Sequence, residues 1–332
     1  MSSNKYDDLD IIRGPFPRPS CADLDAILGF KHNVLHDGFI RVVDYLGTDA
    51  SVVQAARVSY GLGTKTWQED EQLIRFMIRH GHATPFEQCE IKLHVRLPID
   101  VMRQWVRHRT AHVNEYSTRY SEAIDSQHEV APDEWRLQSS TNRQGSGETL
   151  THWLQIDACD WPVDQNSELQ HKTPGEYLTE RQESAHNRAV EVYKEAIRLG
   201  VAREQARAVL PLSTYTEIYW KCDLRNLLGF LRLRLAPDAQ KEIRDYANVI
   251  AEIVEQWVPM TWRAFEDYQL NAMTLSVAEV NWIRTLNSHE IEPDSPDFLN
   301  GGISKREVQE LQAKLVRLGI VASSIRQTGG AS

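Results

Sequence analysis

The chain has 332 residues, of which 41% are hydrophobic and 25% are charged, and its formal net charge is -10. This composition is typical of a globular protein with a substantial core, and the negative charge argues against general affinity for nucleic acid or anionic membranes. No apolar run is long enough for a membrane helix and Met1–Asp10 is polar and acidic, so we expect a cytoplasmic protein. The cysteines are far apart and form no Cys-x-x-Cys pair, which predicts neither disulfides nor a metal site: Cys21, Cys89, Cys159 and Cys222.

The first third of the chain begins with a weakly patterned segment. Residues 1–36 are interrupted by prolines and predict an N-terminal arm or a short surface helix. Phe39–Leu46 is rich in β-branched and aromatic residues, which favours a strand, and Asp49 then begins a short capped helix. A second helix is expected over about Glu69–His80, ending at Gly81, because glycine readily adopts the left-handed backbone of a helix C-terminus.

The clearest strand is Glu90–Leu97, where apolar and polar residues alternate. Pro98 ends it. Apolar residues then recur at helical spacing over Ile99–Val106, so this helix brings Arg107, His108 and Arg109 to its C-terminal end.

The middle of the chain turns polar from about Ala123 to Tyr177, which predicts an insertion over about residues 125–177. Helical periodicity returns over Thr179–Leu199 and closes at Gly200. A further helix is expected over about Arg203–Leu210, and Thr214–Trp220 has the pattern of a strand.

The last third is expected to be helical. Leu224–Leu233 predicts a buried helix and Ala239–Trp257 a long amphipathic one. Beyond Leu275 lies a separate tail, whose last helix has Ser304 and Glu307 at capping-box spacing. We interpret this tail as a packing or oligomer-contact appendage.

Residues 107–120 read RHRTAHVNEYSTRY, and the density of cationic side chains is unusual for an acidic protein. Arginine carries a planar, permanently charged fork that suits phosphate, and a hydroxyl in a turn adds donors. The pattern therefore predicts a phosphate site. A purely structural interpretation is that the basic residues complement the helix dipole and the rest form a turn. Binding of RNA or DNA through the basic stripe of Lys92–Arg119 is a further hypothesis, which the net charge disfavours.

Arg-His-Arg followed after seven residues by Ser, here Arg107, His108, Arg109 and Ser117, resembles the motif of the flavin-dependent thymidylate synthases. Further stretches resemble the blocks of that family in the same order: Ala55–Ser59, His80–Glu87, Arg103–Trp105, Arg203–Pro211 and Phe230–Arg234. The resemblance covers about Gly38–Ile124 and Arg181–Phe265. It divides the chain into an arm over 1–36, a synthase domain over 37–272 that contains the insertion, and a helical tail over 273–332.

The resemblance implies an α+β fold, with a mainly antiparallel sheet flanked by long helices, and a homotetramer with shared active sites. It implies methylation of dUMP to dTMP with methylenetetrahydrofolate as carbon donor and NADPH-reduced FAD as hydride carrier. The implied dUMP-binding residues are Gln104, Arg107, Glu115, Tyr116, Ser117, Thr118, Arg119, Arg207 and Arg234. The implied FAD-binding residues are His82, Thr84, Arg107, His108, Arg109, Glu115, Asp223, Leu224, Arg225 and Gly229.

Arg234 is the implied catalytic residue, because an arginine beside the uracil carbonyl and N3 would favour the ionised ring and raise electron density at the carbon to be alkylated. No cysteine nucleophile is then needed. The other interpretation of Arg234 is a plain charge on a helix surface. Ser117 is interpreted as a hydroxyl that positions dUMP, since no His-Asp relay is visible beside it.

The chain departs from the common family pattern at Asp223, Gly229 and Asp238. These departures weaken the FAD assignment and motivate an alternative, a dUMP-binding protein that has lost flavin chemistry. Asp223 could instead cap the helix that begins at Leu224. No glycine-rich dinucleotide motif follows a strand, so arginine and histidine side chains would have to hold the FAD pyrophosphate. His82 could equally be a helix-end histidine.

Overall fold

The computed structural model describes residues 19–58, 67–124, 126–139, 145–153, 172–285 and 305–319. It separates into two compact units, Met1–Leu270 and Asn271–Ser332. Ser59, Cys159 and the expected capping residue Ser304 lie outside the described residues.

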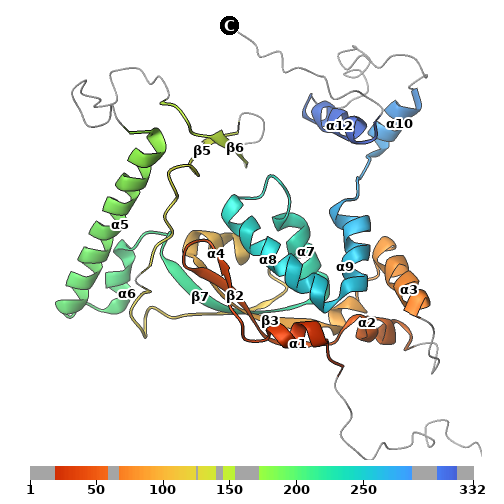
Figure 1. The fold of residues 1–332 in the computed structure, drawn as a ribbon, viewed down its shortest axis with the longest axis horizontal. Coiled ribbons are helices and arrows are strands. Elements are labelled where there is room, and N and C mark those ends of the chain that lie inside the picture. The colour runs from red at the N-terminus through yellow and green to blue at the C-terminus, as the bar shows by residue number, and fades with distance from the viewer. Residues whose placement is uncertain are drawn as a thin grey trace, which may run out of the picture. The chain divides into compact units, whose positions relative to one another are not determined.

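The first unit is built on a five-stranded sheet in the order β1-β2-β3-β7-β4 (Figure 1). Its strands are β1 (His32–Val34), β2 (Gly38–Leu46), β3 (Glu90–Pro98), β4 (His112–Glu115) and β7 (Tyr215–Asp223). All neighbouring pairs are antiparallel, and Val95 of β3 stands between Ile40 and Ile218 in the register. The predicted mainly antiparallel sheet is confirmed.

Helices cover one face of this sheet because every second strand residue is apolar. On β3 the side chains of Ile91, Leu93, Val95 and Leu97 are buried. Three helices carry apolar faces that complete the core: α4 (Ile99–Trp105), α7 (Leu224–Arg234) and α8 (Lys241–Trp257). Trp105 is fully buried and packs against the rings of Trp220 and Phe230.

The described residues before β2, from Pro19 onwards, are part of this unit as well. Helix α1 (Ala22–Ile27) buries Leu24 completely, and β1 pairs with β2 at the edge of the sheet. These elements fall in the segment that the sequence assigns to an N-terminal arm, which remains a prediction for residues 1–18 outside the described part.

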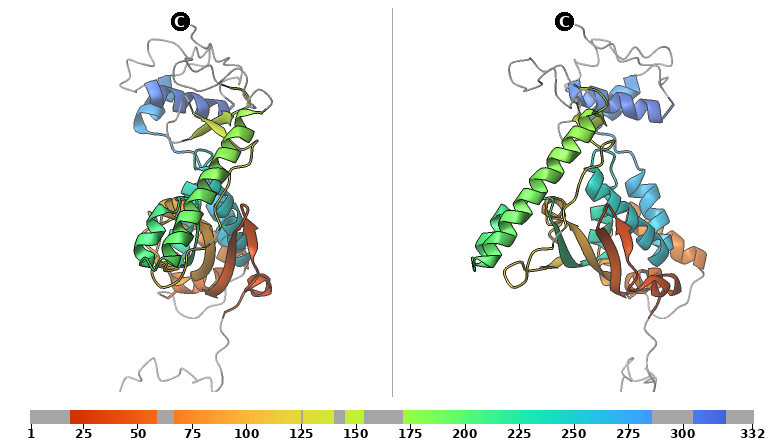
Figure 2. Two further views of the ribbon diagram at one scale, coloured as in Figure 1. Left: turned by 90° about the vertical axis from the view of Figure 1, so that its left-hand side faces the viewer. Right: turned by 60° about the vertical axis from the view of Figure 1, so that its left-hand side comes forward.

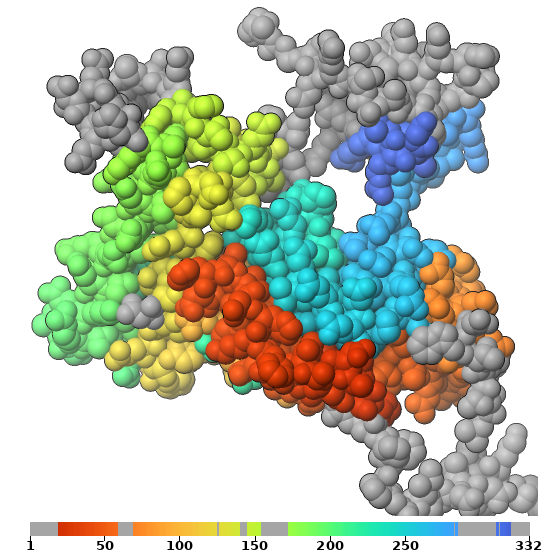
Figure 3. Space-filling model, viewed as in Figure 1, coloured from red at the N-terminus to blue at the C-terminus, as the bar shows by residue number. Residues whose placement is uncertain are grey.

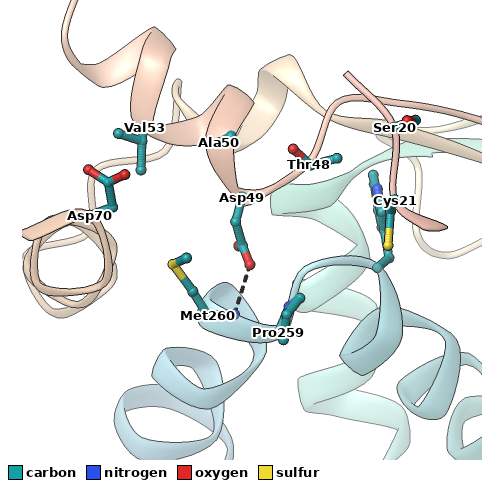
Figure 4. A pocket seen from close by; sticks show the side chains of 10 residues that line it. Ser20, Cys21, Thr48, Asp49, Ala50, Val53, Asp70, Pro259 and Met260 are labelled. Carbon is teal, nitrogen blue, oxygen red and sulfur yellow. Dashed lines mark hydrogen bonds between the residues drawn. The ribbon is translucent and has the colours of Figure 1, made fainter. Parts of the chain in front are cut away.

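Helix α9 (Pro259–Phe265) is capped by a residue distant in sequence. Asp49 begins α2 (Asp49–Ala56), and its buried carboxylate accepts hydrogen bonds from the Met260 and Thr261 amides at 2.8 and 3.0 Å. Figure 4 shows this side chain pointing from α2 into the first turn of α9. Helix α3 (Trp67–Arg79) packs on the same helix, the 3-10 turn η1 (Phe86–Gln88) follows it, and a π-helical turn over Glu266–Leu270 ends the unit.

The long helix α5 (Pro174–Arg198) leads into α6 (Arg203–Ala206) and the 3-10 turn η3 (Arg207–Val209) (Figure 2). The expected single helix over Arg203–Leu210 is therefore wrong in one respect. The chain tightens to 3-10 geometry at Arg207, since Pro211 lies just ahead and cannot continue a helix.

The described start of the polar insertion is an ordered segment, residues 126–138, which we call the strap. It ends in β5 (Arg136–Gln138), which pairs with β6 (Ser146–Thr149). Thr179 of α5 donates to the Val130 carbonyl at 2.8 Å, and Gly175 approaches Pro132 so closely that a Cβ there would overlap its carbonyl oxygen. In the space-filling view the strap, in yellow, lies between α5 and α8 (Figure 3).

The second unit holds α10 (Val277–Thr285) and α12 (Lys305–Arg317). Leu311 and Leu315 of α12 are buried, and Lys314 is paired with Glu279 of α10 at 2.5 Å. Among the helices described in either unit, none combines the length and apolar character required to cross a bilayer.

Candidate active site

Three predicted site residues meet where α4 and α7 end. The Arg234 guanidinium donates from Nε to His108 Nε2 at 3.0 Å and from one terminal nitrogen to the Gln104 backbone carbonyl at 3.3 Å. The other terminal nitrogen lies 3.5 Å from Gln104 Oε1. This group, Gln104, His108 and Arg234, is the guanidinium cluster of the candidate site.

Partial burial sets the protonation of this cluster. Desolvation and the adjacent Arg234 charge lower the pKa of His108 to about 4, so its ring is neutral near pH 7. Burial also lowers the pKa of Arg234, although a guanidinium stays cationic in proteins. Arg234 is held by the neutral groups of His108 and Gln104, so no carboxylate among these contacts neutralises its charge. The positive charge is therefore available to a ligand. The interpretation of Arg234 as a plain surface charge does not fit these contacts.

A second group of predicted residues lies on the loop after β4. Arg207 of η3 donates to Thr118 Oγ1 at 2.8 Å, and Arg119 is ion-paired with Glu204 of α6 at 3.3 Å. The Ser117 carbonyl accepts from the Tyr120 and Ser121 amides, so Ser117 begins a tight turn. The loop therefore brings hydroxyl and guanidinium groups together. We call Ser117–Arg119 with Arg207 the loop cluster.

Strand β4 connects the two groups along the chain. Glu115 pairs with Ile218 in the register, and its carboxylate accepts from the buried Thr216 hydroxyl at 2.9 Å. The Tyr116 amide donates to the Glu217 carbonyl at 2.8 Å, which extends the pairing to the start of the loop. Within the described residues, no hydrogen bond or ion pair joins the guanidinium cluster to the loop cluster.

The residues implied for FAD are distributed differently. His82 and Thr84 are exposed just before η1, and Asp223 caps α7 by accepting from the Asn226 amide at 2.9 Å. The capping role proposed for Asp223 is confirmed. Leu224 is fully buried and its amide donates to the Cys89 carbonyl, so its side chain serves the core. Gly229 has open space where a Cβ would stand.

Arg107 and Arg109 follow α4 and are exposed. In the part of the chain that the structure describes, neither guanidinium is held by an ion pair or a side-chain hydrogen bond. Exposed arginines without protein partners suit the binding of phosphate groups. Arg225, in the first turn of α7, is half-buried.

Two of the described cysteines, Cys89 and Cys222, are buried. Cys21, Cys89 and Cys222 are free thiols. Burial raises the pKa of Cys89 to about 12 and raises that of Cys222 as well, so both stay protonated near neutral pH. Neither of these two buried thiols therefore supplies a thiolate near neutral pH.

Sequence reasoning missed Gln240, whose side chain accepts a hydrogen bond from Gln104 Nε2. Gln240 immediately precedes α8 and has no motif around it. Only the packing of α8 against α4 brings it to the cluster. Thr216, the partner of Glu115, was likewise predicted only as a strand residue.

The family described as thymidylate synthase complementing protein matches residues 41–260. A flavin-dependent thymidylate synthase of Wolbachia pipientis is 45% identical over 294 residues, which cover 88% of this chain and 95% of the relative. That of Ruegeria pomeroyi is 42% identical over 320 residues, covering 94% of this chain and 98% of the relative. Among solved structures, a UMP/dUMP methylase from Streptomyces cacaoi bound with 5-Br dUMP is similar with a TM-score of 0.59 and 28% identity, covering 72% of this chain and 99% of that one. The chain belongs to the flavin-dependent thymidylate synthase family.

Proposed function

We propose that the protein converts dUMP to dTMP, with methylenetetrahydrofolate as the carbon donor and NADPH as the source of reducing equivalents for bound FAD. The single observation that carries this proposal is the guanidinium cluster, in which Arg234 is held by Gln104 and by neutral His108. The family resemblance assigns Gln104 and Arg234 to dUMP and His108 to FAD. The dUMP analogue in the similar methylase supports a pyrimidine nucleotide as the substrate.

In this proposal the two clusters contact different parts of dUMP. The dUMP phosphate is bound by the guanidinium of Arg207 and by the hydroxyls of Ser117 and Thr118. Arg234 faces the uracil and stabilises negative charge on the ring as the new bond to carbon forms. Because Arg234 is partly desolvated, its charge acts more strongly on the ring than it would in water.

The residues around the site fit FAD in their chemistry. Arg107 and Arg109 are exposed guanidinium groups suited to the pyrophosphate, and His82 and Thr84 add polar contacts before η1. When bound, FAD supplies hydride transfer, which protein side chains cannot perform. The protein residues would orient the ligands and exclude water. The Asp223 carboxylate caps the N-terminus of α7 and accepts two hydrogen bonds from Asn226. FAD would therefore contact this end of α7 through residues other than Asp223.

We also propose a homotetramer with shared active sites. In one chain no hydrogen bond or ion pair among the described residues joins the guanidinium cluster to the loop cluster. A second copy could place its loop cluster beside the guanidinium cluster of the first. The cytoplasmic location expected from the sequence stays a prediction, as do the arm and tail boundaries.

Absorption spectroscopy tests the flavin part of this proposal. Purified protein, or protein incubated with FAD and desalted, should show the yellow flavin spectrum, and anaerobic NADPH should bleach it. Protein that stays colourless after incubation with FAD, yet binds dUMP, would instead support the alternative of a dUMP-binding protein without flavin chemistry.

A further inference from the structure

A chain of side-chain contacts leads from the guanidinium cluster to the strap. Arg234 approaches Gln104 Oε1 at 3.5 Å, and Gln104 Nε2 donates to Gln240 Oε1. The Gln240 side chain also lies beside the Glu242 carboxylate and helps to lower its pKa. Glu242 is ion-paired with Arg136 of the strap at 2.9 Å. We call Gln104, Gln240 and Glu242 the amide relay.

The order of donors and acceptors in this relay follows from the chemistry of one end. An ionised carboxylate can only accept hydrogen bonds, whereas an amide has one accepting and one donating end. Glu242 therefore draws the amino group of Gln240, which leaves Gln240 Oε1 facing Gln104. Gln104 must then present its own amino group to Gln240, and its carbonyl oxygen is left facing Arg234.

The Glu242 end of the relay is itself held in place. Its side chain is only 12% exposed, and interactions including those with Gln240 and Arg136 outweigh burial and lower its pKa. The strap is fixed on its other side, since Trp135 Nε1 donates to Thr179 of α5 at 2.9 Å and Val130 N to Gln182 at 2.9 Å. The hydrogen bonds of the strap to α5 therefore hold Arg136 in position to pair with Glu242.

We infer that Glu242 is a positioning residue for the nucleotide site: through Gln240 it sets the orientation of the Gln104 amide, and Arg136 of the strap holds Glu242 in place. The inference rests on the proposed role of Gln104 and Arg234 in dUMP binding. It assigns a function to the strap, which lies within the residues that match the family.

A neighbouring ion pair offers a matched control. Glu134, also on the strap, is paired with Lys241 at 3.1 Å, and Lys241 keeps Asp245 as a second partner at 2.9 Å. Glu134→Gln removes a strap-to-α8 ion pair beside the relay without touching Gln240. Glu242→Gln has the same change of charge, but its amide can turn either end to Gln240, so the orientation is no longer fixed.

The test is calorimetric titration of dUMP into the FAD-loaded protein, with flavin content and thermal midpoint measured in parallel. Glu242→Gln should raise the Kd for dUMP about tenfold, the effect of one misdirected hydrogen bond, while Glu134→Gln binds like wild type. Gln240→Leu should weaken binding similarly, and adding Glu242→Gln to it should have no further effect. Wild-type affinity in Glu242→Gln, equal losses in both Glu variants, or additive losses in the double variant would overturn the inference.

A second readout does not depend on dUMP. Selective ¹⁵N-histidine NMR of the protein reports the pKa of His108, which is low partly because of Arg234. If the relay holds Gln104 against Arg234, Glu242→Gln should shift this pKa and Glu134→Gln should not. Failure of the wild type to bind dUMP would count against the proposed function alone, whereas an unchanged His108 pKa in Glu242→Gln would overturn the relay.

Discussion

Arg234 Nε donates a hydrogen bond to His108 Nε2 at 3.0 Å, and this bond requires His108 to be neutral. The proton of the imidazole must then sit on Nδ1. The T-shaped contact of the His108 ring with Phe230, at a centroid distance of 4.8 Å, supplies the apolar surroundings that favour the neutral form. The motif histidine is therefore an acceptor that orients the arginine.

The first prediction concerns stability at acid pH. The pKa of His108 is 6.5 for the free side chain and about 4 in the folded protein. Between these values the unfolded chain binds a proton that the folded protein does not, so stability is fully present above pH 6.5 and is lost as the pH falls toward 4. His108→Gln removes this titration. Chemical denaturation across this range should show a shallower loss of stability in the variant.

His128 and His186 also have pKa values lowered by burial, and both are present in either protein. Their contribution cancels in the difference between wild type and His108→Gln. If the two curves of unfolding free energy against pH run parallel, His108 is not neutralised by its site.

The second prediction concerns the shape of the Arg234 cation. Its guanidinium contacts His108 and Gln104 from different nitrogens, an arrangement that the single ammonium of lysine cannot reproduce. Arg234→Lys should therefore lose turnover nearly as completely as Arg234→Ala, while both keep flavin bound. Steady-state kinetics with parallel flavin spectra make the comparison. Substantial turnover in Arg234→Lys would show that charge alone suffices.

The third prediction concerns the cap that α2 supplies to α9. The Asp49 carboxylate accepts from two backbone amides and, at 2.6 Å, from the Thr261 hydroxyl. Asp49→Ala should lower the free energy of unfolding by about 2 kcal/mol, because a helix N-terminus loses its acceptor. Asp49→Asn should also destabilise the protein, because it keeps one acceptor oxygen but turns an amino group towards the other backbone N–H. Urea denaturation measures both.

Glu255→Ala, on the exposed side of α8, is the control and should change the unfolding free energy by less than about 0.5 kcal/mol. Equal stability of Asp49→Ala and this control would contradict the capping role.

The fourth prediction separates stability from cofactor binding at Gly229. This glycine lies inside α7, where alanine costs less backbone entropy, and a Cβ there meets open space. Gly229→Ala should raise the free energy of unfolding of the flavin-free protein by about 0.5–1 kcal/mol. If Gly229 faces the flavin as the resemblance implies, the same variant should bind FAD more weakly. Stabilisation with unaltered FAD affinity would remove Gly229 from the cofactor site.

The central strands could be predicted because their burial is one-sided. Alternation over Glu90–Leu97 reports directly that β3 has one covered face. Strand β4 could not be found in this way, since all of its residues are exposed at the sheet edge and show no alternation. Strand β1 is only three residues long, too short for any pattern.

Candidate site residues could be predicted where they stand close together in the sequence. Those that only tertiary packing brings to the site could not. Arg107–Arg109 and Ser117 stand in one short stretch, so their density is visible in the sequence. Gln240 contacts Gln104 only through the packing of α8, and Arg136 of the strap pairs with Glu242 of α8. No local spacing in the sequence predicts either contact. Roles assigned to the other motif residues stay predictions.

The central claim is that the protein makes dTMP by a flavin-dependent route through Arg234. The most direct measurement is dTMP formation in reactions containing dUMP, methylenetetrahydrofolate, NADPH and FAD, each omitted in turn, with wild type and Arg234→Ala. We predict product from flavin-free wild type only in the complete mixture, and none from Arg234→Ala. Equal dTMP formation by Arg234→Ala, or by flavin-free wild type without added FAD, would contradict it.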